Sequence, residues 1–127
     1  MHVVLSSDSA SPIYEQIKVQ MRSAILSGSI PAGATLPSLR QLAADLRVSI
    51  VTVTRAYNDL VAEGLARNEH GRGFVVLEVD ASLAQQALDA TLDDLLRRLL
   101  VAAGHAGVDL PELHRRIDEQ WRSEWTT

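Results

Sequence analysis

Apolar residues recur at helical spacing in three stretches of the first half of the chain. Ser11 and Pro12 suit the start of the first helix, and Gly28 suits its end. The second and third stretches are separated by "RVS", and each follows a serine that can cap a helix, Ser38 or Ser49. The spacing predicts three helices with these buried residues: Ile13, Ile17, Met21, Ala24, Ile25, Leu39, Leu42, Ala43, Leu46, Val53, Ala56, Tyr57 and Leu60.

Strand-like patterns lie around these helices. Residues 65–68 and 74–79 are two β-prone runs, and the "EHGRG" between them has the glycines of a hairpin tip. β-branched residues also predict a short strand at residues 2–6, ahead of a Ser/Asp turn cluster. Three helices followed by a hairpin is the element order of a winged helix-turn-helix. We therefore expect a mainly α (α+β) fold, with a winged helix-turn-helix domain at residues 1–79.

The pattern becomes leucine-rich after residue 79. Residues 83–103 carry a wide apolar stripe, "GHAG" interrupts it, and Asp109, Pro111 and Glu112 indicate the start of a second helix. Two such helices cannot bury the stripe alone, so they need the first domain or a second copy. We expect residues 80–127 to form a helical dimerisation domain, with an interface made by Leu88, Leu92, Leu95, Leu96, Leu99, Leu113, Ile117 and Trp121.

Composition narrows the class of protein. The chain has 127 residues and no cysteine, which excludes disulfides and thiolate chemistry. It shows neither a membrane span nor a signal peptide, so we expect a cytoplasmic protein with no membrane partner. The net charge of −4 argues against nucleic acid, yet residues 1–78 hold 7 basic and 7 acidic residues, so the tail carries the excess acid. A neutral first half can bind phosphates if its arginines share one face.

Catalysis has no recognisable basis in the sequence. The four histidines are scattered, and no helix follows "HGRG" to complete a phosphate-binding loop. His105 and His114 stand nine residues apart across a loop, which is weak evidence for a metal. We therefore expect no catalytic residue, no metal and no cofactor. A tail of 48 residues is also small for a ligand pocket of a few hundred Å³, so an effector stays unknown.

Four segments resemble the DNA-binding domain of GntR-family transcriptional regulators. They are "PIYEQI", "GSIPAGATLPSLRQLAADLRVS", "TVTRAYNDLVAEGL" and "GRG", within residues 10–78, and the short two-helix tail resembles the YtrA branch. The resemblance implies a sequence-specific regulator of transcription, with repression as the expected mode, that binds a palindromic double-stranded DNA operator as a homodimer. The alternative is a winged-helix protein-interaction module without DNA binding.

The resemblance also implies where DNA is contacted. Many relatives carry Asn-x-Asn-Thr at the start of the recognition helix, where this chain has Ser49-Ile50-Val51-Thr52. We expect Ile50 and Val51 to touch thymine methyl groups instead. Arg55 either contacts phosphate or pairs with Asp59 one turn on. The expected DNA-binding residues come from the second helix, the recognition helix and the wing tip: Ser38, Arg40, Ser49, Ile50, Val51, Thr52, Arg55, His70, Gly71 and Arg72.

Overall fold

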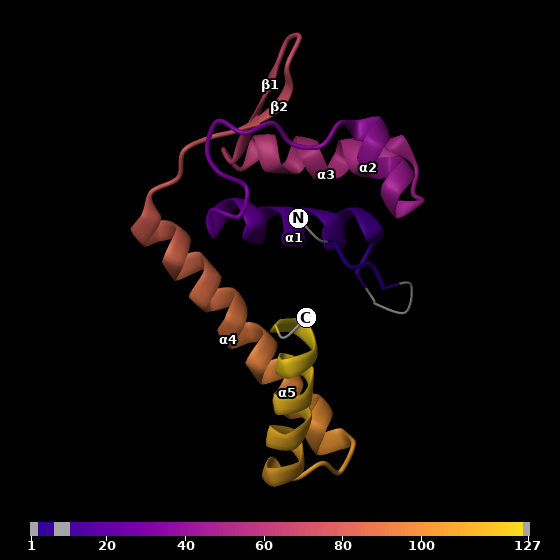
Figure 1. Ribbon diagram of the computed structural model, residues 1–127, viewed down its shortest axis with the longest axis vertical. Coiled ribbons are helices and arrows are strands. Elements are labelled where there is room, and N and C mark those ends of the chain that lie inside the picture. Colours follow the sequence, from indigo (N-terminus) through magenta and orange to yellow (C-terminus); the bar gives the residue numbers. More distant parts are fainter. Residues whose placement is uncertain (1–2, 7–10, 126–127) are drawn as a thin grey trace. The chain divides into compact units, whose positions relative to one another are not determined.

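The computed structural model describes residues 3–6 and 11–125, in two compact units (Figure 1). The units are Met1–Leu88 and Asp89–Thr127, and the boundary falls within the fourth helix. The predicted fold is confirmed: a winged helix-turn-helix followed by two helices. The elements are α1 (Ile13–Leu26), α2 (Leu39–Leu46), α3 (Ile50–Ala62), β1 (Ala66–Glu69), β2 (Gly73–Val76), α4 (Ala81–His105) and α5 (Leu110–Trp125).

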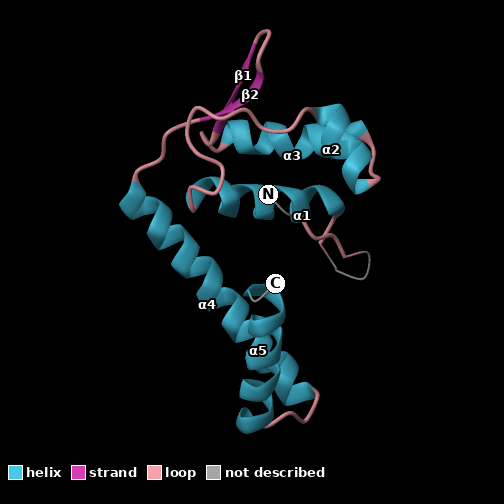
Figure 2. Cartoon of the chain, viewed as in Figure 1, coloured by secondary structure: helices cyan, strands magenta, loops and turns pink. Residues whose placement is uncertain are grey.

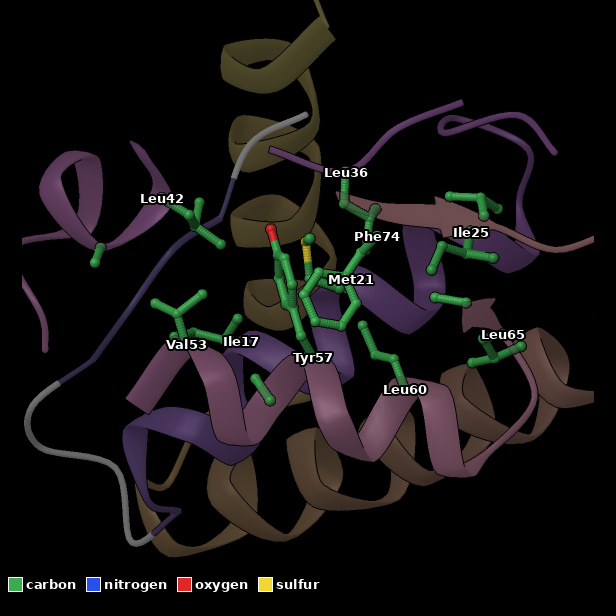
Figure 3. Packing of buried hydrophobic residues seen from close by; sticks show 14 residues of the cluster. Ile17, Met21, Ile25, Leu36, Leu42, Val53, Tyr57, Leu60, Leu65 and Phe74 are labelled. Atoms are coloured by element: carbon green, nitrogen blue, oxygen red, sulfur yellow. The ribbon is translucent and has the colours of Figure 1, made fainter. Parts of the chain in front are cut away.

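The core of the first unit forms where α1, α2, α3 and the hairpin meet (Figure 3). All four residues predicted for the inner face of α3 are buried. The Tyr57 ring meets the Phe74 ring edge-on, with centroids 5.0 Å apart. The Tyr57 hydroxyl donates to the Pro37 carbonyl at 2.7 Å, and burial raises the pKa of this phenol. This bond fixes the loop before α2 against α3.

Serine caps place the starts of α2 and α3. Ser38 Oγ accepts from the Gln41 backbone N–H at 3.0 Å, and Ser49 Oγ accepts from that of Thr52 at 3.1 Å. Each cap satisfies one of the free N–H groups of a first helical turn, as the sequence predicts. The turn between the two helices has an unusual residue. Arg47 is left-handed, with φ 57° and ψ 47°, and is the one non-glycine residue with positive φ in the described part of the chain.

The wing is an antiparallel hairpin (Figure 2), and a segment outside the hairpin pairs with its second strand. β1 and β2 are antiparallel, and the register runs from Ala66 opposite Val76 to Glu69 opposite Gly73. Residues 33–36 lie along β2: the Leu36 N–H donates to the Phe74 carbonyl at 2.8 Å, and the Val76 N–H donates to the carbonyl of residue 34 at 2.9 Å. The segment that leads into α2 is therefore tied to the wing.

The strand predicted at residues 2–6 is wrong for residues 3–6, and residue 2 lies outside the described residues. Residues 3–6 have no regular secondary structure. Glutamine side chains of α1 take the place of a partner strand, because Gln20 pairs with both backbone groups of Val4 and Gln16 with both of Ser6. The start of α1 also differs: Pro12 is the N-cap, without a side-chain cap bond, and not Ser11.

The second unit contains most of α4 and all of α5. α4 continues through the glycine of "GHAG" and ends at His105, two residues beyond the predicted end. Gly107, with φ 70°, lies in the turn that follows. Asp109 Oδ1 accepts from the Glu112 backbone N–H at 3.0 Å, which is the predicted cap of α5. The Glu112 carboxylate binds Arg115 and Arg116, one turn further along the helix.

Candidate nucleic-acid interface

A groove of about 570 Å³ brings together three of the predicted contact regions. It is bordered by the start of α2, the start of α3 and the wing. Ser38 and Arg40 come from the first, Ile50 from the second and Arg72 from the third. These residues are distant in the sequence, and the helix-turn-helix and the paired segment 33–36 make them neighbours. A groove between a helix start and a wing, bordered by two arginines, suits a phosphate backbone.

The first turn of α3 exposes an apolar surface. Val51 is 77% exposed and Ile50 is 45% exposed. The hydroxyls of Ser49 and Thr52 lie 2.8 Å apart and bond to each other, beside the backbone cap already described. The two apolar side chains are therefore free to meet a partner, while the two hydroxyls are partly engaged. Methyl-bearing side chains at this position can discriminate thymine in a major groove by contact.

Arg55 lies over an aromatic ring. Its guanidinium carbon is 3.7 Å from the centroid of the Tyr14 ring, which comes from the first turn of α1. The alternative partner, Asp59, pairs with Lys18 instead, at 3.6 Å. Sequence reasoning missed Tyr14, although it lies within the "PIYEQI" segment. A cation held over an aromatic face keeps its edge N–H groups available to a phosphate.

The wing tip is ordered by bonds from Arg72. Its Nη1 donates to Glu69 Oε2 at 3.1 Å, and its Nη2 donates to the Gly33 carbonyl at 3.2 Å. Gly71, at φ 84°, makes the turn with the exposed His70. Arg67 also binds Glu69, and this hydrogen bond is the main reason that the pKa of the Glu69 carboxyl lies below its usual range. Sequence reasoning missed Glu69.

The residues predicted for dimerisation are mainly exposed. Leu92, Leu96, Leu99 and Ile117 are all exposed, and the largest exposed fractions are those of Trp121 at 64% and Leu92 at 56%. Leu88 is half-buried and belongs to the first unit. The remaining two residues differ from each other: Leu113 is 8% exposed and packs within its own tail, and Leu95 is 52% exposed.

The described residues form neither a metal site nor a helix that could span a membrane. Among residues 3–6 and 11–125, no three His, Asp or Glu side chains gather as a metal site would require. None of the helices in this described part combines the length and the apolar character of a membrane span. Within the second unit, α4 and α5 border an apolar groove of about 720 Å³, next to Leu99 and Trp121.

Comparison with known proteins defines the class. The family model described as bacterial regulatory proteins, gntR family, matches residues 13–76. The chain is 36% identical over 111 residues to the HTH-type transcriptional repressor YtrA of Bacillus subtilis, which covers 87% of this chain and 85% of that protein. The chain therefore belongs to the GntR family. The predicted resemblance to this family and to its YtrA branch is confirmed.

Solved structures agree with this assignment. A GntR family transcriptional regulator from Listeria monocytogenes superposes with a TM-score of 0.63 at 26% identity, over 88% of this chain and 97% of that one. YtrA from Sulfolobus acidocaldarius, a GntR-family transcription factor, gives 0.57 at 33% identity, over 78% and 97%. The DNA-binding domain of AraR in complex with an operator gives 0.51 at 32% identity, over 60% and 92%. The protein is a DNA-binding regulator of transcription.

Proposed function

We propose that the protein acts as a homodimeric repressor on a palindromic operator. Residues 1–79 are the DNA-binding domain in this proposal, and residues 80–127 hold two copies together. The observation that carries the proposal is the exposed leucine face of α4, with Leu92 and Leu95 both more than half exposed. A contiguous apolar face of this kind marks an interaction site in a soluble protein. A two-fold dimer matches a palindrome, with its two recognition helices about one duplex turn apart.

The proposed mode of regulation and the proposed location both rest on the similarity to known regulators. The Bacillus subtilis protein is named a transcriptional repressor, and it matches this chain over most of both lengths. We extend repression to this chain on that similarity. A regulator of transcription works where the DNA lies, so we propose a cytoplasmic protein. The proposal assigns it no catalytic activity, since the relatives are regulators of transcription.

The proposed DNA contacts divide by chemistry. The amino-terminal ends of α2 and α3, at Ser38 and Ser49, offer free N–H groups and partial positive charge to phosphates. Arg40 adds a full charge beside the first of these ends. Ile50 and Val51 contact base edges in the major groove. Thr52 and Arg55 follow them along α3 and contact the phosphate backbone in this proposal. The wing tip, with His70, Gly71 and Arg72, lies along the minor groove and backbone.

Stoichiometry tests the proposal. The protein is first used to select a preferred site from a pool of random duplex DNA. Sedimentation velocity then measures the mass of the complex with the selected duplex, which gives the number of chains bound. We expect two chains per selected duplex and an inverted repeat in the selected sequences. A single chain per duplex, together with a monomer at tens of micromolar protein, contradicts the dimer. Equal binding of selected and scrambled duplexes contradicts sequence-specific recognition.

A further inference from the structure

The carboxylate of Glu69 lies between two arginines of the wing. Arg67 donates to its Oε1, and Arg72 donates to its Oε2 at 3.1 Å. Arg67 and Glu69 share a face of β1 because they stand two residues apart on a strand. The Glu69 side chain is 25% exposed, and both arginine side chains are more than half exposed. A carboxylate on a surface that meets phosphates weakens binding by direct repulsion. Any favourable effect of Glu69 on DNA binding must therefore act through the arginines that it binds.

Arg72 connects the wing to the segment that leads into α2. Its Nη2 donates to the Gly33 carbonyl at 3.2 Å, next to the residues that pair with β2. A guanidinium has five N–H donors in a rigid fork. The bonds to Glu69 and Gly33 use two of them, so three are left for a ligand. Because the fork is planar, the two bonds already made set the direction of the remaining three. Arg72 in this position borders the same groove as Arg40 and Ile50.

We propose that Glu69 is a positioning residue for DNA binding, which holds Arg72 at the groove with its remaining donors directed at the duplex. The inference rests on the proposed function, in which the wing contacts DNA. The gain is entropic, because a long arginine side chain that is already ordered loses less freedom when DNA binds. Direct repulsion between Glu69 and phosphate has the opposite sign: loss of the carboxylate then tightens binding. The sign of the effect separates the two roles.

The test is a double-mutant cycle between Glu69 and Arg72. Glu69→Gln keeps the size of the side chain but turns one of its two acceptor oxygens into a donor, so it cannot serve both arginines. We titrate the duplex selected from the random pool with wild type, Glu69→Gln, Arg72→Ala and the double variant at one salt concentration. Glu69→Gln should weaken binding about two- to fivefold, in line with an exposed ion pair. It should cause no further loss when Arg72 is already alanine.

Two matched controls separate positioning from general charge. Glu78→Gln makes the same charge change at an exposed residue just after β2, and should leave affinity within the error of the titration. Arg67→Ala removes the other arginine that shares the carboxylate but does not border the groove. The effect of Glu69→Gln should persist in that background. A second readout needs no DNA: Arg72 Nε–Hε relaxation by NMR should show a more mobile side chain in Glu69→Gln than in wild type.

Several results overturn the inference. Tighter binding by Glu69→Gln in both backgrounds assigns Glu69 to phosphate repulsion. An equal loss with and without Arg72 shows that Glu69 acts by another route, and an unchanged Arg72 relaxation shows that the carboxylate does not order the side chain. If Arg72→Ala weakens binding and Glu69→Gln does not, the positioning role of Glu69 is wrong, while the wing contact of the proposed function stands. If Arg72→Ala binds like wild type, the wing contact of the proposed function fails, and positioning for DNA fails with it.

Discussion

Single side chains join parts of the first unit that are far apart in the sequence. Tyr14 from α1 supports Arg55 of α3, and Tyr57 holds the loop before α2 through Pro37. Both contacts cross from one element to another, so the position of Arg55, a proposed DNA contact, depends on a residue of α1. Substitutions away from the interface should therefore change affinity through the orientation of the groups that do.

Replacing Tyr14 tests this dependence. Tyr14→Leu removes the aromatic face under Arg55, and Tyr14→Phe keeps it. We expect Tyr14→Leu to weaken operator binding about two- to fivefold and to lower the free energy of unfolding by about 0.5–1 kcal/mol, the range for an exposed cation–π pair. Tyr14→Phe should lose less than half as much on both measures. Anisotropy titration and urea denaturation give the two values, and equal losses in the two variants would show that the ring face does not matter.

The sequence predicted which residues of α3 are buried, but not which side chains pair with each other across elements. The buried positions of α3 follow from helical spacing, which depends only on neighbours along the chain. Arg55 was left with two alternatives, phosphate or Asp59, because the partner it has, Tyr14, lies on another helix. Glu69 was missed for a related reason. Its role depends on the hairpin register, which brings Arg67 and Arg72 to one carboxylate. The order of charged residues in the sequence does not reveal this register.

Among the secondary-structure elements, local features were predicted correctly, whereas pairing between distant segments was not. The caps at Ser38 and Ser49 were predicted because a cap is made within four residues. Residues 2–6 were predicted as a strand because β-branched residues favour an extended backbone, but this preference does not say what pairs with them. Here the partners are the amides of Gln16 and Gln20. Likewise the pairing of residues 33–36 with β2 joins segments about forty residues apart. Pro31 and Pro37 on either side of this run, and Gly33 within it, favour a loop and give no sign of that pairing.

The recognition helix and the wing should affect binding differently. Arg72→Ala removes a charge that we propose contacts the minor groove and the phosphates. It should therefore weaken binding to the operator and to random duplex by similar factors, and reduce the salt slope by about one phosphate contact. Ile50→Ala and Val51→Ala remove methyl contacts without charge, so they should weaken the operator more than random DNA. Each variant needs titrations of both duplexes at two salt concentrations. The division is wrong if Arg72→Ala harms only the operator while both helix variants harm the two duplexes equally.

The amino-terminal end of α5 should respond to acid through Glu112. Hydrogen bonds from Arg115 and then Arg116 lower the pKa of this carboxyl from 4.5 to about 2. A carboxyl with a depressed pKa in the folded state contributes stability above pH 4.5, and that contribution disappears as the pH falls toward 2. The difference in unfolding temperature between wild type and Glu112→Gln should therefore be largest near neutral pH and vanish near pH 2. Glu124→Gln, later on the same helix, is the control, and a pH-independent difference refutes the assignment.

The whole molecule combines a DNA-binding unit with a tail whose apolar face is exposed. Leu92 and Leu95 lie on that face of α4, and Val101, also exposed, lies on the opposite side of the helix, since each residue turns an α-helix by about 100°. Aspartates at Leu92 and Leu95 would be buried, unpaired charges in a dimer and solvated ones in a monomer. The oligomeric state of variants with aspartate at these positions therefore tests whether this face is the dimer interface.

We expect Leu92→Asp/Leu95→Asp to be monomeric at tens of micromolar, while Val101→Asp remains dimeric. The monomer should still fold, because both leucines are more than half exposed within one chain. It should bind a single half-site as the wild type does and lose the added affinity of the second half-site. Light scattering and circular dichroism measure assembly and folding. A dimeric double variant with an intact fold would place the interface elsewhere.

The left-handed backbone of Arg47 strains the turn between α2 and α3. An L-residue in this conformation costs roughly 1–2 kcal/mol, which glycine avoids at an entropic cost of about 0.5–1 kcal/mol. Arg47→Gly should therefore raise the free energy of unfolding by about 0.5–1 kcal/mol, while Arg47→Ala should give no such gain; an equal gain in both would remove backbone strain as the cause. The same change deletes an exposed cation beside the recognition helix. Arginine and glycine codons can differ by one base, so a single mutational step can relieve this backbone strain.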